Sequence, residues 1–482
     1  MRRFTVYDTL SRESRLFAPL TPPKVGLFVC GLTPYADAHI GHAKTALTFD
    51  VVARALKHWG YRVFYVQNVT NIDDRLIARG AQEEIDPLTL ADRHFLAWQI
   101  AMERLGARRV NYYPHATDYL PEIIDQVRIL VERGLAYVSR GSVYFDVAKS
   151  PNYGKLSGQR TEALRPGARV EPEPDKRAPE DFVLWKAATP GEPTWESPWG
   201  PGRPGWHIED TAITVRLFGP RYDVHGGGLD LKFPHHEAEI AQAEGATGES
   251  PLVNYWMHVG LLTMKGEKMS KSLGNVVGLN ESLDAVGAMP LRFFYLNAQY
   301  RSPLDFVPGK SLEEAREAYG RLVGPLRRLR EESDRAGTDR AGLELPEEVA
   351  RLASDTVAAM DDALADDFNT RESLARLFTW GRTVTEWVDR LGALSSSALE
   401  QLAAPYAWAE EVLGIGLEED SGTLSRRLAP LIAVALEARQ RARARGDYPE
   451  SDRIRDDLLA AGVRVEDQGA QTRWQLVAAP RT

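Results

Sequence analysis

Residues 24–70 read "KVGLFVCGLTPYADAHIGHAKTALTFDVVARALKHWGYRVFYVQNVT", and this stretch determines the fold class. Residues 24–31 form a short apolar run that ends at a glycine, which predicts a buried strand. In residues 39–60 small and apolar side chains recur at every fourth position before a closing glycine, as is typical of a helix. Residues 61–70 predict a second strand. Strand, helix and strand in this order form a right-handed parallel βαβ unit, so we expect a doubly wound α/β domain here.

Composition changes along the rest of the chain and divides it into further parts. The next segment is rich in proline, glycine and tryptophan, which indicates an insertion, and helical patterns begin near residue 311. We expect an α/β domain with an insertion, then a helical bundle and a small C-terminal module. The expected bounds are 1–110 and 226–310 for the two halves of the α/β domain, 111–225 for the insertion, 311–420 for the bundle and 425–482 for the module.

Overall composition is that of an ordinary globular protein, with 43% hydrophobic and 26% charged residues. No apolar run approaches the roughly 20 residues of a membrane span, and the basic start lacks an apolar stretch, so we expect neither a membrane segment nor a signal peptide. The single cysteine, Cys30, excludes an internal disulfide and fits a reducing cytoplasm. The net charge of −9 disfavours a general nucleic-acid coat, although residues 426–482 carry more arginines than carboxylates.

The stretch "FPHHEAEIAQAE", residues 233–244, concentrates histidines and carboxylates. If a helix begins near Pro234, His235 and Glu239 lie one turn apart on one face and can supply two metal ligands. The commoner alternative is the polar start of a surface helix, because carboxylates favour helix N-termini. This stretch alone does not decide between them, since two more ligands have to come from elsewhere.

Two further motifs carry chemistry: "HIGH", with His39 and His42, and "GEKMSKSLGN", with Lys268 and Lys271. The two histidines lie where a strand gives way to a helix, a location that favours phosphate, and their imidazoles can donate hydrogen bonds to a triphosphate. The two lysines lie in a glycine- and serine-rich loop that can close over a polyphosphate. Either motif alone is compatible with exposed polar residues. Together, in this order and on this fold, they favour a polyphosphate site.

The two motifs resemble the signatures of class I aminoacyl-tRNA synthetases. Further segments are similar to cysteinyl-tRNA synthetases specifically, and the similarity extends from about residue 4 to Trp474. These segments are "VCGLTPYADAHIGHAKT", "NVTNIDDR", "DFVLWK", "SPWGPGRPGWHIE", "DVHGGGLDLKFPHHEAEIAQ", "NYWMHVG" and "RSPLDF", and the tail "RARARGDYPESDRIRDDLLAAGVRVED" resembles the family's anticodon-binding domain. The resemblance implies a Rossmann-like class I catalytic domain with a connective insertion, a helical bundle and an anticodon-binding module.

The resemblance also implies a zinc ion, which the family holds with two cysteines, a histidine and a glutamate. The matching positions are Cys30, Asp210, His235 and Glu239. Asp210 stands where the family has a cysteine; a carboxylate is an acceptable zinc ligand, but it should make the site weaker and less selective. Zinc binds a thiolate far better than a hydroxyl, so it can separate cysteine from serine where a hydrophobic pocket cannot.

Other site residues are implied by the same resemblance. Thr70, Trp206 and Asp230 would line the amino-acid pocket, with Asp230 receiving the ammonium group. A tryptophan is more often simple packing, so the role of Trp206 has this alternative. In the tail, the anticodon contacts would be Arg443, Asp452 and Trp474. Arginine and aromatic side chains suit unstacked RNA bases, while a salt-bridged helix face is the alternative for the charged residues.

The sequence therefore predicts a cysteine–tRNA ligase, with ATP, its Mg²⁺, L-cysteine and tRNA(Cys) as substrates. ATP and cysteine would form cysteinyl adenylate, and the cysteinyl group would pass to the terminal adenosine of the tRNA. His39 and His42 would stabilise the phosphoryl transition state, and Lys268 and Lys271 the leaving pyrophosphate. One alternative is a ligase that joins cysteine to an amino sugar; the other is an inactive tRNA-binding paralogue. We expect a cytoplasmic monomer.

Overall fold

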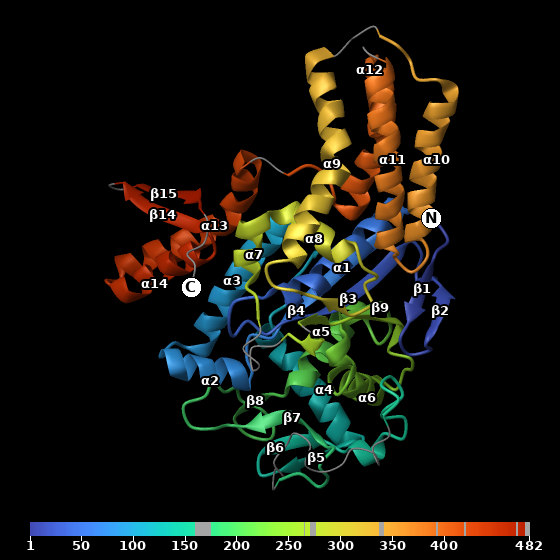
Figure 1. Cartoon of the computed structure of the whole chain (residues 1–482). Coiled ribbons are helices and arrows are strands. Elements are labelled where there is room, and N and C mark those ends of the chain that lie inside the picture. The colour runs from blue at the N-terminus through green and yellow to red at the C-terminus, as the bar shows by residue number, and fades with distance from the viewer. Residues whose placement is uncertain are drawn as a thin grey trace.

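The computed structural model describes residues 1–159, 175–264, 266–269, 276–336, 342–391, 394–418, 421–468 and 471–477. Within these ranges no helix combines the length and the apolar character that crossing a bilayer requires. Figure 1 shows a central sheet with the insertion below it, a bundle of long helices above it and a C-terminal module at one side.

Four parallel strands form the central sheet in the order β10-β9-β3-β4. Helix α1 connects β3 to β4, and helix α6 connects β9 to β10, which confirms the predicted βαβ unit and the α/β fold class. Because β4 lies on one side of β3 and β9 on the other, the strand order reverses between β3 and β9. In such sheets ligands bind outside the carboxyl ends of the strands at this switch point. The bounds are β3 Lys24–Leu32, α1 Ile40–His58, β4 Arg62–Val69, β9 Tyr222–Gly228, α6 His235–Thr247 and β10 Val253–Val259.

The packing of α1 follows the predicted four-residue period. Ala43, Leu47, Val51, Ala55 and Trp59 are all buried, and they belong to the largest hydrophobic core together with the apolar residues on one face of β3. The helix therefore covers the sheet with one face, as an amphipathic helix does.

The insertion contains a four-stranded antiparallel sheet in the order β5-β6-β7-β8, and its hydrophobic core is shared with α6 of the α/β domain. Helix α5 follows β8 and leads the chain back to the central sheet, so it connects the insertion to the α/β domain. The bounds are η1 Ala116–Tyr119, α4 Leu120–Glu132, β5 Ala136–Ser139, β6 Ser142–Phe145, η2 Val147–Lys149, β7 Phe182–Ala187, β8 Gly202–Pro204 and α5 Trp206–Phe218.

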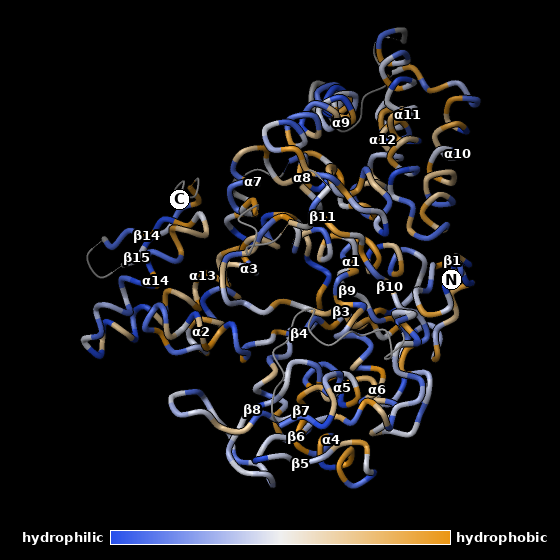
Figure 2. The backbone as a smooth tube through the Cα atoms, turned by 60° about the horizontal axis from the view of Figure 1, so that its bottom comes forward, coloured by the Kyte–Doolittle hydropathy of each residue, from blue (hydrophilic) through white to orange (hydrophobic). Residues whose placement is uncertain are grey.

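The remaining part of the chain is mainly helical. Four helices, α9 to α12, form the bundle, and Figure 2 shows hydrophobic and hydrophilic residues alternating along α10 and α11, as expected for helices that bury one face. The bounds are α7 Leu279–Val286, α8 Ala288–Leu296, α9 Ser311–Ala336, α10 Glu347–Leu364, α11 Thr370–Leu391, α12 Ser396–Trp408 and η6 Ala409–Leu413.

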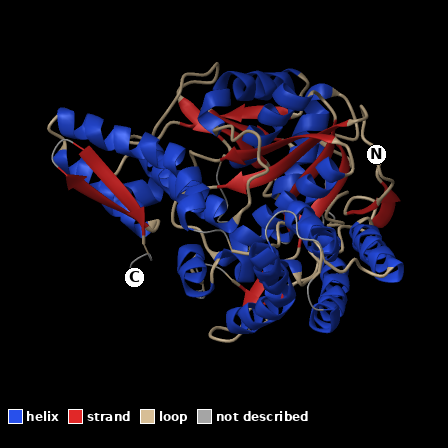
Figure 3. Cartoon of the chain, turned by 90° about the horizontal axis from the view of Figure 1, so that it is seen from above, coloured by secondary structure: helices blue, strands red, loops and turns tan. Residues whose placement is uncertain are grey.

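The C-terminal module consists of two helices and a two-stranded antiparallel sheet, and it protrudes from the rest of the chain (Figure 3). Its core residues, among them Leu428 and Ile432, pack against Ile100 of α3, which attaches the module to the α/β domain. The bounds are α3 Pro87–Leu105, α13 Ser421–Ala444, α14 Tyr448–Ala460, β14 Val463–Gln468 and β15 Gln471–Leu476; the other short elements are β1 Thr5–Asp8, β2 Glu13–Leu16, α2 Asp74–Glu83, β11 Leu262–Met264, β12 Glu267–Lys268 and β13 Leu304–Asp305.

A buried ion pair joins α1 to the helical part. Arg292 of α8 is fully buried, and its Nη2 lies 2.6 Å from Asp50 Oδ2. Arg292 also donates to the carbonyl oxygens of Gly106 and Leu413, at 3.1 and 2.9 Å. Burial alone would raise the pKa of Asp50, but the guanidinium groups of Arg292 and Arg54 hold it below its ordinary value. The pair therefore ties α1, α8, the end of α3 and the end of the bundle together.

Replacing Asp50 with asparagine should lower the free energy of unfolding by about 3–5 kcal/mol, because Arg292 would keep its charge without a counter-ion. Urea denaturation followed by tryptophan fluorescence measures this change. The control is Glu372→Gln, which breaks an exposed ion pair with Arg376 and should cost less than about 1 kcal/mol. Equal losses in the two variants would contradict the role given to the buried pair.

Candidate active site

The two histidines of the HIGH motif lie at the start of α1. His39 is the N-cap residue, and its Nδ1 accepts a hydrogen bond from the backbone N–H of Gly41 at 3.1 Å. His42 Nδ1 accepts from the backbone N–H of His39 at 3.3 Å, and the two rings stack with centroids 3.7 Å apart. A neutral imidazole that accepts at Nδ1 carries its proton on Nε2. Both Nε2 atoms are therefore donors, which is what contact with phosphate oxygens requires.

The segment after the lysine motif lies beside the HIGH motif. Ile40 N–H donates to Val277 O at 3.1 Å, and Leu279 N–H donates to Ala38 O at 3.0 Å. Lys268 belongs to β12, which pairs with β11, whereas Lys271 lies outside the described residues. The residues that follow the lysine motif therefore lie at the N-terminus of α1.

Lys44 provides a second contact between α1 and the part of the chain around the lysine motif. The sequence analysis did not single out this residue. Its Nζ donates to the carbonyl oxygens of Gly260 and Ser302, at 2.6 and 2.8 Å. Burial lowers the pKa of Lys44 to about 8. Because Gly260 lies two residues before β11, this lysine holds the β11–β12 hairpin, which includes Lys268, against α1.

The four residues aligned with the zinc ligands of the resembling family converge at the carboxyl end of β3. Cys30 Sγ lies 3.1 Å from Asp210 Oδ2 and 3.7 Å from Glu239 Oε1. His235 Nε2 lies 3.0 Å from Asp210 Oδ2 and 3.1 Å from Glu239 Oε1. All four side chains are buried. α6 begins at His235, so His235 and Glu239 share a helix face as the sequence predicted.

Two more histidines, which the sequence reasoning missed, face the same sulfur. His236 Nε2 lies 3.2 Å and His225 Nε2 3.7 Å from Cys30 Sγ. His236 stood in the quoted stretch, and its three-residue spacing from Glu239 was an available signal. His225 lies on β9, and no local pattern connects it with Cys30.

Two glycines make this convergence possible. A side chain at Gly31 would place its Cβ 1.8 Å from the backbone oxygen of Asn68, so only glycine lets the end of β3 lie this close to β4. A Cβ at Gly227 would lie 2.7 Å from Cε1 of His236, so the imidazole rests directly on the backbone of β9.

The cluster combines buried acids with neutral histidines. Burial, and then the charges of Asp210 and Glu239, raise the pKa of the Cys30 thiol, and burial also raises the pKa of Glu239 and of the neighbouring Glu209. Burial lowers the pKa of His225 and His236 well below the ordinary value, so both stay neutral. Within the described residues no lysine or arginine forms an ion pair with Glu209, Asp210 or Glu239. Among the described residues these acids therefore have only histidines as possible cationic partners.

These residues fit a metal ion. Glu239 Oε2 is buried and has no hydrogen-bond partner within the described part of the chain. Cys30, Asp210, His235 and Glu239 each offer one ligand atom, and these atoms lie within 4.8 Å of one another. Metal–ligand bonds of about 2.0–2.3 Å in a tetrahedron separate the ligand atoms by about 3.3–3.6 Å, close to the separations observed here.

Asp210 has an additional partner that orients it. Asn68 Nδ2 donates to Asp210 Oδ1, and Asn68 Oδ1 accepts from Gly31 N–H at 2.7 Å. Since one carboxylate oxygen is occupied in this way, Asp210 presents its Oδ2 to Cys30 and His235.

The residues expected in the amino-acid pocket lie around this cluster. The half-buried ring of Trp206 stacks on His235 with centroids 4.3 Å apart. Thr70 Oγ1 donates to Glu209 Oε1 at 2.8 Å. Asp230 is exposed on η4 (Leu229–Lys232), directly after β9. The structure thus brings Trp206 and Thr70 to the cluster and leaves Asp230 at the surface beyond the carboxyl end of β9.

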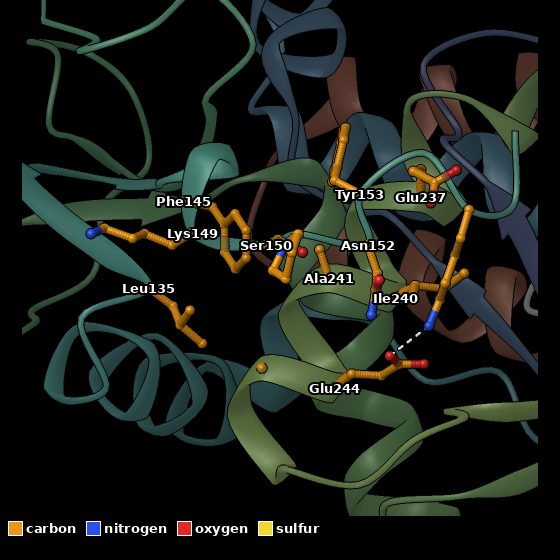
Figure 4. A pocket seen from close by; sticks show the side chains of 13 residues that line it. Leu135, Phe145, Lys149, Ser150, Asn152, Tyr153, Glu237, Ile240, Ala241 and Glu244 are labelled. Carbon is orange, nitrogen blue, oxygen red and sulfur yellow. Dashed lines mark hydrogen bonds and ion pairs between the residues drawn. The ribbon is translucent and has the colours of Figure 1, made fainter. Parts of the chain in front are cut away.

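A cavity of about 150 Å³ lies beside α6, between this helix and the insertion (Figure 4). It is lined by Glu237, Ile240, Ala241 and Glu244 of α6, and Lys155 forms an ion pair with Glu244 at 2.6 Å. At 3.6 residues per turn these residues occupy the helix side away from the metal-binding face. The cavity is therefore distinct from the cluster.

In the C-terminal module, Arg443 pairs with Asp467 at 2.7 Å and Asp452 pairs with Arg455 at 3.0 Å. Trp474 is partly buried against the core of the module. Tyr448, at the start of α14, is 63% exposed and was missed by the sequence reasoning. Its exposed ring is available for stacking on a base.

Comparison with known proteins extends these observations to the whole chain. A family model described as the catalytic domain of class I (C) tRNA synthetases matches residues 16–317, and the cysteinyl-tRNA ligase anticodon binding domain matches residues 426–474. The cysteine–tRNA ligase of Carboxydothermus hydrogenoformans is 41% identical over 98% of this chain and 100% of its own length. That of Dehalococcoides mccartyi is 43% identical over 98% and 99%.

Solved structures show the same fold at low sequence identity. Methionyl-tRNA synthetase of Mycobacterium tuberculosis, in complex with methionyl-adenylate, superimposes with a TM-score of 0.58 at 16% identity, covering 95% of this chain and 99% of its own. A putative arginyl-tRNA synthetase from Campylobacter jejuni gives a TM-score of 0.57 at 14% identity, covering 81% and 93%.

If the cluster binds a divalent cation, the metal should stabilise the fold, because the unfolded chain has no preformed site. Zinc at about 100 times its dissociation constant should raise the free energy of unfolding of chelator-treated protein by about 2.7 kcal/mol. Differential scanning calorimetry with and without zinc measures the shift of the thermal midpoint. Cys30→Ala should respond far less, and an unchanged midpoint in the original protein would contradict a metal site.

Proposed function

The chain belongs to the cysteinyl-tRNA synthetase family of class I aminoacyl-tRNA synthetases, and on this premise we propose that its buried cluster holds the zinc ion that selects cysteine. The activity is the ATP-dependent ligation of L-cysteine to tRNA. The observation that supports the zinc proposal is the convergence of Cys30, Asp210, His235 and Glu239 with no lysine or arginine partner among the described residues. When bound, zinc would supply a soft Lewis acid that prefers a thiolate to a hydroxyl.

The substrate cysteine would lie between the cluster and Trp206. The ring of Trp206 forms a wall beside His235, and the exposed carboxylate of Asp230 would receive the ammonium group. Thr70 would act through its hydrogen bond to Glu209, which fixes the floor of this pocket. These contacts would orient the substrate carboxylate toward the start of α1.

Activation would take place at the start of α1, with ATP bound together with Mg²⁺. The substrate carboxylate oxygen attacks the α-phosphorus, and the bond to the leaving pyrophosphate breaks. His39 and His42 would donate from Nε2 to the phosphate oxygens, and Lys268 and Lys271 would neutralise the pyrophosphate. In the second step a ribose hydroxyl of the terminal adenosine attacks the carbonyl carbon, and AMP leaves. No protein nucleophile is required, because positioning and charge stabilisation supply the catalysis.

The C-terminal module would bind the anticodon. Arg443, Asp452 and Trp474 are the contacts proposed from sequence, and the exposed ring of Tyr448 adds a base-stacking surface. In the free protein Arg443 and Asp452 are engaged in ion pairs, which binding to RNA would have to exchange.

Neither alternative activity has comparable support. An amino-sugar ligase does not require the anticodon-binding domain that matches residues 426–474. An inactive paralogue would not need both the HIGH and the lysine motif. ATP–pyrophosphate exchange that depends on cysteine, followed by charging of bulk tRNA, tests the ligase directly; exchange without tRNA charging would favour the amino-sugar ligase.

Asp210→Cys should raise zinc affinity, because a second thiolate softens the site. It should also increase the ratio of kcat/KM for cysteine over serine in pyrophosphate exchange. Asp210→Asn is the matched variant: it keeps the shape, removes the charge and should bind zinc more weakly. Loss of zinc from Asp210→Cys would place Asp210 outside the metal shell.

Lys271→Ala should lower the rate of adenylate formation by about 10²–10³, as expected when a group that stabilises transition-state charge is removed. The dissociation constant for tRNA should stay nearly unchanged. Lys310→Ala, which removes an exposed lysine paired with Glu314, is the control and should leave both quantities unaltered. An equal loss of exchange and tRNA affinity would contradict the proposed role.

A further inference from the structure

Lys44 is a buried cation without an acidic partner among the described residues. Its side chain is 2% exposed, and none of the ion pairs that lysines form in this part of the chain includes it. Its Nζ donates instead to two backbone carbonyl oxygens, of Gly260 at 2.6 Å and of Ser302 at 2.8 Å. An ammonium group buried without a counter-ion opposes folding, so its contacts call for a role other than stability.

The two carbonyl groups belong to segments that are distant in sequence and meet at this point. Gly260 N–H donates to Tyr300 O at 2.9 Å. A Cβ at position 260 would lie 2.4 Å from the backbone oxygen of Ser302, so the two backbones can approach this closely only because residue 260 is a glycine. Since both oxygens accept hydrogen bonds from the same ammonium group, Lys44 joins the two segments to each other and to α1.

These segments lead into the hairpin of the lysine motif. Strand β11 pairs with β12, which includes Lys268, and with β13 on its other side. The turn of the hairpin has a separate contact, because Asp305 Oδ1 accepts from Thr263 Oγ1 at 2.8 Å and from Gly266 N–H at 3.1 Å. Asp305 therefore holds the turn against β13, whereas Lys44 attaches the base of this small sheet to α1.

Helix α1 contacts described residues on both sides of the lysine motif. Before the motif the contact is made by Lys44, and after the motif Ile40 N–H donates to Val277 O at 3.1 Å. His39 and His42 lie at the start of the same helix, so Lys44 follows the second histidine by only two positions. One helix thus carries the histidines proposed to contact ATP and the side chain that holds the hairpin of the lysine motif.

We propose that Lys44 is a positioning residue for amino-acid activation, because its ammonium group sets the distance between the HIGH histidines and the hairpin that includes Lys268. This inference rests on the proposed function, in which the histidines and Lys268 act on the same polyphosphate. Without the two hydrogen bonds the hairpin would be free to shift relative to α1. A displacement of about 1 Å in a catalytic arrangement can lower the rate about 100-fold.

The kinetic test is cysteine-dependent ATP–pyrophosphate exchange by the full-length protein. Lys44→Met keeps a side chain of similar length and loses both hydrogen bonds, so kcat should fall by about 10- to 100-fold while the KM for cysteine stays nearly unchanged. Lys44→Arg keeps the charge and the N–H donors and should recover most of this loss. The control is Thr48→Val on the same helix, where the buried hydroxyl donates to the backbone oxygen of Lys44; its kcat should equal that of the original protein.

A double-mutant cycle separates positioning from general damage. In a Lys268→Ala background the hairpin no longer presents this ammonium group, so the cost of Lys44→Met should be at least about threefold smaller. Effects that multiply in full would overturn the proposal, because Lys44 would then act independently of Lys268. Asp305→Ala, at an exposed position, releases the hairpin at its turn and should also lower kcat at an unchanged KM for cysteine; a normal kcat would overturn the proposal as well.

Hydrogen–deuterium exchange detects the contact without catalysis. In Lys44→Met the amides of Gly260 and Leu304, at the base of the small sheet, should exchange about tenfold faster, whereas those of β3 and β4 should be unchanged. Unchanged protection at the base, or an equal loss of protection throughout the protein, would overturn the proposal. If the original protein shows no cysteine-dependent pyrophosphate exchange, the proposed function fails, whereas the contact made by Lys44 is judged by these amides.

Discussion

The burial of acidic groups with no lysine or arginine partner among the described residues is the constraint on which the candidate active site depends. Glu209, Asp210 and Glu239 are all buried, and His225 and His236 are neutral because burial lowers their pKa. Moving a carboxylate from water into the interior costs several kcal/mol unless it is paired. The proposed cation would both compensate these charges and provide affinity for the sulfur of the substrate.

Strand β3 connects the candidate metal cluster with the HIGH motif. It ends at the cluster with Cys30 and leads through a short loop to His39, where α1 begins. The same helix carries Asp50, whose buried pair with Arg292 holds α1 against α8 and the end of the bundle. The proposed positions of nucleotide and thiol are thus linked through one strand and one helix to the helical part that precedes the C-terminal module.

Local patterns were sufficient for the central βαβ unit and for the start of α6, because periodicity and helix signals depend on neighbouring residues. Helix spacing indicated His235 and Glu239 as a possible ligand pair, whereas Cys30 and Asp210 followed only from a family resemblance. His225 escaped prediction because its contact with Cys30 depends on the pairing of β3 with β9, which no short pattern encodes. The ion pair of Arg292 also could not be predicted, because its partner Asp50 lies 242 residues away and nothing in the apolar stretch of α8 identifies that partner.

The distance in sequence between Cys30 and Glu239 has a consequence for the assembly of the protein. The two residues are 209 positions apart, and the whole antiparallel insertion is synthesised between them. During translation the lone sulfur emerges from the ribosome long before its partners exist. Capture of the proposed cation therefore has to wait until α6 has been synthesised, and a chain without the cation would hold these buried acids uncompensated.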